Sequence, residues 1–179
     1  MIPAGSSTGQ IRALSANAGR FTARQTSLID AIWIPVKDGN DTGRAIFENH
    51  YSRHKYRDGR FNRLFCGPGE KMVLVTPDAL ALFVWRKFFS MNHQEGINCA
   101  VFRNEGAAGG RSSDLIRAAM NLAWERWPQE RLYTYVDPRK VIHKRDPGRC
   151  FLRAGWIHAG WTVKNHLRIL EALPCDPSA

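Results

Sequence analysis

Basic side chains crowd residues 53–63, with aromatic rings between them and one acidic residue against them: Arg53, Lys55, Tyr56, Arg57, Asp58, Arg60, Phe61 and Arg63. Guanidinium and ammonium groups bind phosphates, and aromatic rings stack on bases, so this composition is typical of a nucleic-acid contact. A merely solvated basic loop is the alternative reading, and the residues alone leave it open.

A second group of cations follows a predicted strand near residue 137. Its members are Arg139, Lys140, Lys144 and Arg145, with His143 among them. We predict that these four cations join the first group in binding the same polyanion.

The segment NEGAAGGRSS (104–113) is rich in glycine and directly precedes a strong helix pattern. Apolar residues recur at three-and-four spacing from Leu115 to Ala123, and Pro128 stops the helix. A glycine loop at a helix N-terminus presents backbone N–H groups at the positive end of the helix dipole. This loop therefore predicts a site for the phosphates of a bound molecule.

The overall charge separates classes of substrate. The 179 residues carry 26 Lys and Arg against 16 Asp and Glu, a formal charge of +10. A protein so basic repels cationic substrates and attracts polyanions. The four cysteines show no metal-binding spacing, which argues against structural zinc.

The elements that must position these groups follow one another in a readable order. We expect a strand over 28–36, then a helix capped by Asn40 or Asp41 that carries Ile46 and Phe47 and is closed by His50 and Tyr51. Three antiparallel strands should follow, over 71–75, 80–88 and 97–102.

The second half begins with the glycine loop and the long helix. We then expect a strand over 131–137 and a short helix with Asp146 as its cap, Pro147 as its first residue and Gly155 at its end. Two strands, 156–163 and 166–173, complete the pattern, and all six Trp are assigned to packing.

The ends of the chain differ from its centre in composition. Residues 1–26 contain Arg12, Arg20 and Arg24 but no acidic residue, which predicts a flexible basic arm. We expect one domain over 27–173 and a disordered tail over 174–179. The sequence shows neither an apolar stretch long enough for a membrane span nor a secretory signal, so we expect a cytoplasmic protein without membrane contact.

This order of elements over residues 29–173 resembles the GNAT acyltransferase superfamily. The resemblance implies an α/β (α+β) fold: a mixed, mostly antiparallel sheet splayed between its fourth and fifth strands, with helices on both faces. It also implies a loop that holds the pyrophosphate of an acyl-thioester cofactor. The loop signature is matched by Arg103, Gly106 and Ala108, whereas alignment on the helix selects Gly110 and Ser112.

Both registers together give one set of cofactor-binding candidates: Arg103, Gly106, Ala108, Gly109, Gly110, Arg111, Ser112 and Ser113. Ser112 most simply caps the long helix, and a cap hydroxyl can also donate to a phosphate or carbonyl of the donor.

Five segments are similar to the Mom family of phage DNA-modification proteins: ENHYSR, CAVFRNEG, SSDLIRAA, RLYTYVDP and DPGRCFLRAGW. Members of this family convert adenine in DNA to a carbamoylmethyl derivative on its exocyclic nitrogen. The resemblance implies a phage enzyme that acts in the host cytoplasm and protects phage DNA from restriction. Its functional positions correspond here to His50, Tyr51, Arg103, Ser112 and Asp137.

Asp137 is the preferred general base, because the implied fold places it at the end of the fifth strand, facing the splay. An Asx turn before Pro138 is its alternative role. His50 and Tyr51 are candidates for a base, a group that orients the base, or a metal ligand. Either His50 or Asp137 could contact a metal, which is neither required nor excluded.

Arg103 should bind a carboxylate, a phosphate or the acyl donor, or else pair with Glu105 or Asp137. Tyr133 and Tyr135 share one face of their strand. Either could stack on a base or act as an acid, with packing expected for one of them, and we select Tyr135 as the catalytic candidate.

The expected partner is double-stranded DNA with the target adenine flipped out. The donor is an activated acyl compound, either an acyl-coenzyme A or an activated glycyl ester such as an aminoacyl-tRNA. Two alternatives stay open: a GNAT N-acetyltransferase that uses acetyl-coenzyme A on a protein or RNA, and a non-catalytic DNA-binding module.

Overall fold

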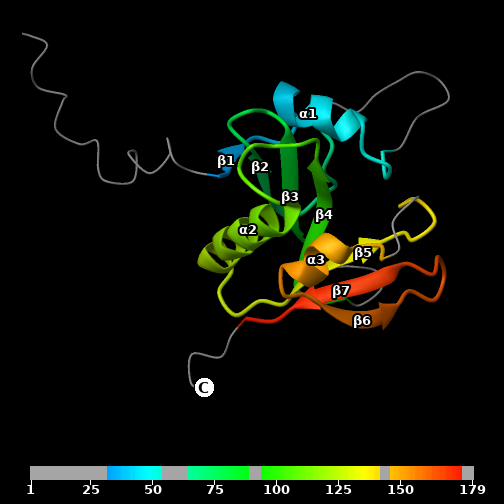
Figure 1. Cartoon of the computed structure of the whole chain (residues 1–179). Coiled ribbons are helices and arrows are strands. Elements are labelled where there is room, and N and C mark those ends of the chain that lie inside the picture. The colour runs from blue at the N-terminus through cyan, green and yellow to red at the C-terminus, as the bar shows by residue number, and fades with distance from the viewer. Residues whose placement is uncertain (1–31, 54–63, 89–93, 142–145, 175–179) are drawn as a thin grey trace, which may run out of the picture. The chain divides into compact units, whose positions relative to one another are not determined.

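The computed structural model describes residues 32–53, 64–88, 94–141 and 146–174 (Figure 1). The predicted arm (1–26) and residues 175–179 of the predicted tail lie outside these ranges. The elements in chain order are β1 (Ile34–Val36), α1 (Asp41–Glu48), β2 (Glu70–Val75), β3 (Ala81–Lys87), β4 (Ile97–Asn104), α2 (Ser112–Arg126), β5 (Leu132–Val136), α3 (Arg149–Arg153), β6 (Ile157–Trp161) and β7 (Arg168–Ala172).

The strands form one seven-stranded sheet in the order β1-β2-β3-β4-β5-β7-β6. Among the described strands, only β4 and β5 pair in parallel, and the other five pairs are antiparallel. A parallel pair needs a crossover, and α2 provides it. The prediction of a mixed, mostly antiparallel sheet within an α+β fold is confirmed.

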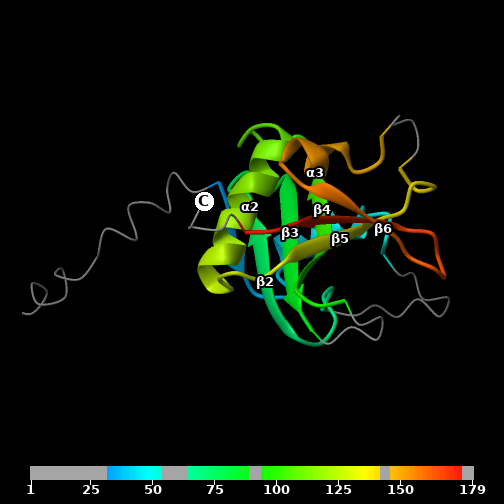
Figure 2. The same cartoon turned by 90° about the horizontal axis from the view of Figure 1, so that it is seen from below.

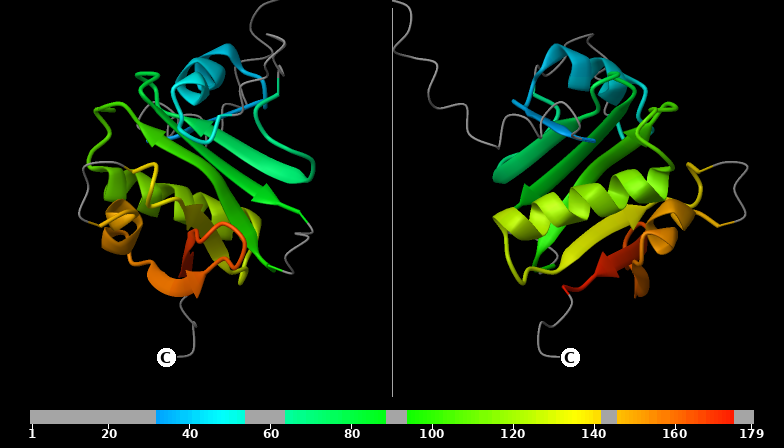
Figure 3. Two further views of the ribbon diagram at one scale, coloured as in Figure 1. Left: turned by 90° about the vertical axis from the view of Figure 1, so that its right-hand side faces the viewer. Right: turned by 60° about the vertical axis from the view of Figure 1, so that its left-hand side comes forward.

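The two faces of the sheet carry different helices because side chains alternate along each strand. Leu74, Phe83 and Trp85 pack in the cluster that contains α2 and α3, which lie next to each other (Figure 2). Val73, Val75 and Val84 pack on the opposite face with Ile46 of α1. Helices therefore cover both faces, as predicted (Figure 3).

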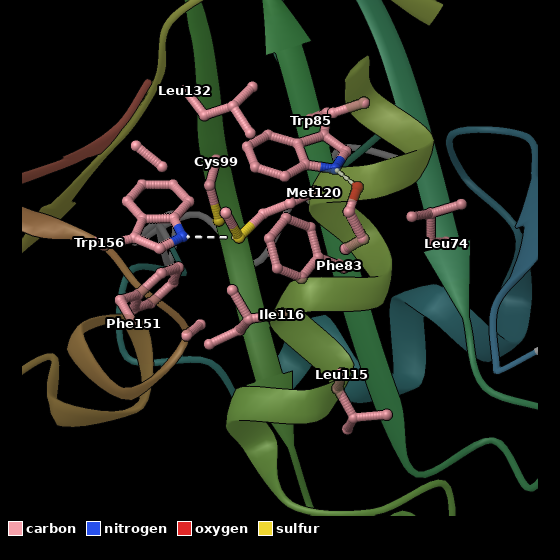
Figure 4. Packing of buried hydrophobic residues seen from close by; sticks show 14 of the residues in the cluster. Leu74, Phe83, Trp85, Cys99, Leu115, Ile116, Met120, Leu132, Phe151 and Trp156 are labelled. Carbon is pink, nitrogen blue, oxygen red and sulfur yellow. Dashed lines mark hydrogen bonds between the residues drawn. The ribbon is translucent and has the colours of Figure 1, made fainter. Parts of the chain in front are cut away.

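Tryptophan indoles hydrogen-bond α2 to the sheet and to the segment between α3 and β6 (Figure 4). The Trp85 Nε1–H donates to the Ala119 carbonyl at 3.0 Å, and that of Trp156 donates to the Met120 sulfur at 3.0 Å. These bonds satisfy polar groups that would otherwise be costly to bury. Packing was the prediction for all six tryptophans, but Trp161 on β6 is 45% exposed and the prediction is wrong for it.

The first helix begins as predicted, since the Asn40 side chain accepts from the Gly43 N–H at 3.0 Å. It ends at Glu48, so His50 and Tyr51 follow the helix instead of closing it. The first strand covers only 34–36 of the expected range, of which 28–31 lie outside the described residues.

Two predicted caps are wrong. The short helix α3 begins at Arg149 and not at Pro147, because Gly148 takes a left-handed φ of 85° and Asp146 pairs with Arg168 at 2.6 Å. Ser112 is the first residue of α2 and not its cap; its Oγ accepts from the Asn104 amide at 3.1 Å. Arg111 is the N-cap residue, and its backbone N–H donates to the Asp114 carboxylate at 3.1 Å.

Within the described ranges, no helix has both the length and the apolar character needed to cross a membrane.

Candidate functional site

The strands β4 and β5 part in the middle of the sheet. Their pairing covers only Ile97 to Cys99 against Leu132 to Thr134, whereas β4 continues to Asn104. Cys99 and Val101 face consecutive residues of β3, so Ala100 is the extra residue of a β-bulge. A bulge bends its strand and increases the local twist, which accounts for the separation at this point.

A cavity of about 380 Å³ lies on the helix side of this separation, and we call it the α2-side cavity. The residues at the starts of α2 and α3 supply its charged and much of its polar lining: Arg111, Ser112, Ser113, Asp146, Arg149, Cys150 and Arg153. Nearby ion pairs use other arginines, namely Arg117 with Asp114 and Arg168 with Asp146. Within the described part of the chain, none of the three lining arginines forms an ion pair, so this cavity suits an anion.

A second cavity, of about 330 Å³, lies beside the β6–β7 hairpin, and we call it the hairpin-side cavity. Its polar lining comes from four segments: Ser52, Asn98, Asp137, Arg139, Lys140 and Asn165. Two cavities of this kind, one on each side of the same pair of strands, can hold two reactants that meet between them.

Five residues line both cavities: His50, Tyr51, Cys99, Ala100 and Tyr135. The Tyr51 ring stacks on that of His50, with centroids 4.5 Å apart. Burial raises the pKa of the Tyr51 phenol, while the backbone N–H of Asp137, directed at the same oxygen, opposes that change. Tyr51 thus extends from the end of α1 to the end of β5 and carries a neutral hydroxyl at the point where the cavities meet.

His50 is a buried residue, 8% exposed, with both ring nitrogens in hydrogen bonds. Its Nδ1 accepts from the Ser52 N–H at 3.2 Å and lies 2.7 Å from the Ser52 Oγ. The Phe102 backbone also hydrogen-bonds the ring, and burial together with the charge of Arg103 lowers the pKa of His50 to about 4. These contacts make His50 a positioning residue for Tyr51, because no lone pair is left for a proton or a metal.

Asp137 lies at the end of β5, as expected, and lines the hairpin-side cavity. Its carboxylate accepts from the Arg139 N–H at 3.0 Å, from Arg139 Nε at 2.9 Å and from Nη2 at 3.0 Å. These bonds lower the pKa of Asp137 below its ordinary value and complete the Asx turn considered as its alternative role. Asp137 therefore forms the Asx turn and also lines the cavity.

Among the residues that the structure describes, the side chains do not fit a metal ion. Within the described ranges no group of three His, Cys, Asp or Glu side chains could hold one.

Arg103 lines neither cavity. Its Nε donates to Glu105 Oε1 at 2.7 Å, which is one of the two ion pairs considered from the sequence. The Asn49 amide donates to the same oxygen at 3.0 Å, so the arginine is part of a bridge between α1 and β4. Its charge acts on the site indirectly, through the pKa of His50.

The backbone of the glycine loop is engaged by the protein's own side chains. Asn104 Oδ1 accepts from the Gly106 and Ala107 N–H groups at 2.9 and 2.8 Å, and Asp78 Oδ2 accepts from that of Ala108 at 2.7 Å. Gly106, Ala108, Gly109 and Gly110 line neither cavity. Of the predicted cofactor-binding set, the structure brings Arg111, Ser112 and Ser113 to a cavity.

The predicted nucleic-acid contacts are only partly described. Arg139 and Lys140 line the hairpin-side cavity, and Arg53 pairs with Glu48. The other predicted contacts lie outside the described residues: Lys55, Tyr56, Arg57, Arg60, Arg63, Lys144 and Arg145.

Sequence reasoning missed Arg149 and Arg153. They lie four residues apart on a short helix, a spacing that places both side chains on one face and could have indicated a shared site. Tyr135, the predicted catalytic candidate of the two tyrosines on β5, lines both cavities, and the hydroxyls of Tyr133 and Tyr135 are buried without a hydrogen-bond partner in the described structure.

Comparison with known proteins adds no assignment: no protein-family model matches the chain, and no curated protein is significantly similar to it.

Proposed function

We propose that this protein is a GNAT-like DNA-modifying enzyme that converts adenine in DNA to its exocyclic-nitrogen carbamoylmethyl derivative. The observation that carries the proposal is the pair of cavities that meet at Tyr51 where β4 and β5 separate. One cavity suits an anionic donor, and the other opens beside cations in a protein of charge +10. Phage DNA that carries the product would escape host restriction.

The donor belongs in the α2-side cavity. Three arginines without ion pairs among the described residues and the Ser112 hydroxyl favour a donor with phosphate or other anionic groups. Because Asn104 and Asp78 already bind the N–H groups of Gly106, Ala107 and Ala108, we assign donor binding to the arginines and Ser112 and not to this part of the loop. Acyl-coenzyme A and an activated glycyl ester such as an aminoacyl-tRNA both satisfy this chemistry.

The target adenine belongs in the hairpin-side cavity. Its exocyclic amine is a weak nucleophile because its lone pair is delocalised into the ring. The nitrogen becomes far more acidic as its new bond to carbon forms, so Asp137 can accept the proton despite its low pKa. Asp137 therefore acts late, on the addition intermediate.

Tyr51 acts on the carbonyl oxygen between the two reactants. Its hydroxyl accepts from the Asp137 N–H and keeps its own proton, which it can donate to the oxygen that becomes negative. The β4 backbone beyond Cys99 pairs only with β3 in the described sheet, which leaves its other edge facing the site. His50, fixed by Ser52, keeps the Tyr51 ring in place.

A glycyl donor explains the product without a second enzyme. The exocyclic nitrogen attacks the glycyl carbonyl and loses a proton to Asp137, the acyl–oxygen bond of the ester breaks, and the carrier leaves as its alcohol. The free amine of the transferred glycyl group then attacks the ring carbon. The original nitrogen then leaves as the terminal amide, and a carbamoylmethyl group remains on the new exocyclic nitrogen.

Nucleoside mass analysis of plasmid DNA from cells that express the protein tests the proposal. We expect a deoxyadenosine heavier by one carbamoylmethyl group. DNA with unmodified adenine would overturn the proposal, provided that the protein is folded and expressed.

A second candidate function is acetylation of a protein or RNA with acetyl-coenzyme A, which the arginine-lined α2-side cavity also suits. Calorimetric titration with coenzyme A separates the two. Tight binding together with unmodified DNA favours the acetyltransferase, and DNA binding with no chemistry at all favours a non-catalytic module.

A further inference from the structure

The hairpin formed by β6 and β7 exposes apolar and aromatic side chains at the edge of the sheet. Strand β6 is the last strand in the order and pairs only with β7 in the described structure. Val163 in the connecting turn is fully exposed at 101%, and Trp161 at the end of β6 is 45% exposed. We call residues 161–166 the hairpin tip.

The exposed tryptophan is held in a fixed orientation by two histidines. The Trp161 ring stacks on His166 with centroids 5.1 Å apart and planes 16° from parallel. His158 meets its edge, with centroids at 5.4 Å. A pre-oriented ring loses little conformational freedom when a flat partner stacks on it.

The hairpin tip lies next to the cavity assigned to adenine. Asn165 in the tip and Leu167 just beyond it line the hairpin-side cavity, as do Arg139 and Lys140 from the segment after β5. In Figures 1 and 2 the tip and that segment extend toward the same side of the sheet. Lys164 adds a further cation within the tip itself.

We propose that the hairpin tip is the element that engages duplex DNA beside the target adenine and fills the space left when that base leaves the stack. The inference rests on the proposed function for the identity of the base. Val163 acts as the apolar wedge, and Trp161 stacks on an exposed base or sugar. Arg139, Lys140 and Lys164 contact phosphates on either side.

The chemistry of the tip supports this choice of partner. A base that leaves the duplex exposes two apolar base faces, and an apolar side chain inserted there offsets part of the lost stacking. The cations around the tip complement the phosphates that flank such a step. The neighbouring carboxylates do not oppose it, since Asp137 pairs with Arg139 and Glu171 with Arg131.

Fluorescence of 2-aminopurine tests the inference, because this adenine analogue brightens when it leaves the stack. The experiment titrates the full chain into short duplexes that carry 2-aminopurine at successive positions and follows binding through a terminal dye. Wild-type protein should bind and should brighten the analogue. Trp161→Ala should weaken binding about tenfold, whereas Val163→Ser should bind nearly as well but brighten the analogue much less.

Ile157→Ser is the matched control. Ile157 is 55% exposed on the same strand, but at its other end, where it pairs with Glu171. The Ile157→Ser variant should change neither DNA binding nor the fluorescence of 2-aminopurine. Wild-type behaviour in both tip variants would overturn the inference, as would a dimer that Trp161→Ala dissociates, because the surface would then bind a second copy of the chain.

The outcome separates this inference from the proposed function. If the wild type brightens 2-aminopurine but leaves cellular adenine unmodified, the proposed function fails and the role of the tip stands. If both tip variants modify plasmid DNA at the wild-type level, the role of the tip fails and the proposed function stands.

Discussion

The two cavities share a wall but differ in how their charges are compensated. In the α2-side cavity Arg111, Arg149 and Arg153 form no ion pair among the described residues. In the hairpin-side cavity the one carboxylate, Asp137, is bound by Arg139 through three hydrogen bonds. The first presents three cations to an anion, and the second presents a neutralised Asp137–Arg139 pair with one further cation, Lys140, beside it, which suits an uncharged base with its phosphate nearby.

This difference in charge assigns a different reactant to each cavity. A charged donor is favoured on the helix side, and a neutral acceptor meets it at Tyr51 from the hairpin side.

Asp137→Asn should have the largest effect. The amide keeps the turn and the side-chain size but loses the charge and the ability to accept a proton. The rate of adenine modification should fall by roughly 10² to 10⁴, measured as modified nucleoside in plasmid DNA, while DNA affinity is retained. The rate of the Asp137→Glu variant should lie between those of the wild type and the Asn variant. Modification at the normal rate by the Asn variant would show that Asp137 is only a turn residue.

Tyr51→Phe should come next, because it removes the hydroxyl at the meeting point of the cavities and keeps the ring that stacks on His50. Loss of one hydrogen-bond donor to a developing oxyanion typically costs about 10² to 10³ in rate. The loss in rate is measured by nucleoside analysis at a single time point, calibrated against a dilution series of the wild type. A loss of less than about threefold would assign Tyr51 to substrate packing.

His50→Gln tests the positioning role through stability. The folded pKa of His50, about 4, lies below its ordinary value of 6.5, so the unfolded chain binds an extra proton between these values. The resulting stability is complete above pH 6.5 and is lost as pH falls toward 4, by about 3 kcal/mol in total. Chemical denaturation at a series of pH values should show a shallower acid loss in the Gln variant than in the wild type.

Replacement of Arg149 and Arg153 by Gln should have the smallest effect of the four. We expect binding of inorganic pyrophosphate, measured by calorimetry, to weaken by roughly tenfold, because charge-assisted hydrogen bonds to the anion are lost. Arg126→Gln is the matched control, an exposed arginine on α2 that pairs with Glu70. Equal binding by the double variant and the control would contradict the assignment of the anion site.

Local patterns predicted the fold well. Apolar and β-branched runs predicted β2, β3 and β4 as consecutive antiparallel strands, and residue type alone predicted the first helix cap at Asn40 or Asp41. The start of α3 was not predictable in this way, because it depends on a pair between Asp146 and Arg168, 22 residues apart. The Asp146-Pro147 sequence is typical of a helix cap, but in the folded chain the Asp146 side chain binds Arg168 and does not cap the helix.

The candidate site likewise combines residues that local sequence predicted with features that depend on tertiary contacts. Tyr51, Tyr135, Ser112 and Asp137 were selected from the sequence and line the cavities. The hydrogen bond from the glycine loop to Asp78 was not predicted from the sequence, because Asp78 lies in a different connection, between β2 and β3, and contacts Ala108 only in the folded chain. The bulge at Ala100 also has no local signature, since it appears only in the register between β3 and β4.

The central claim is that donor and adenine meet at Tyr51, where the two cavities join beside Ala100, and quantification of modified adenine after expression of wild-type and Ala100→Leu protein tests it most directly. Ala100 lines both cavities, and the larger side chain should close the junction between them. The account predicts carbamoylmethyl-adenine from the wild type and near-background levels from the variant, with DNA affinity and circular dichroism unchanged. Equal modification by the two proteins, or unmodified adenine from the wild type, would contradict it.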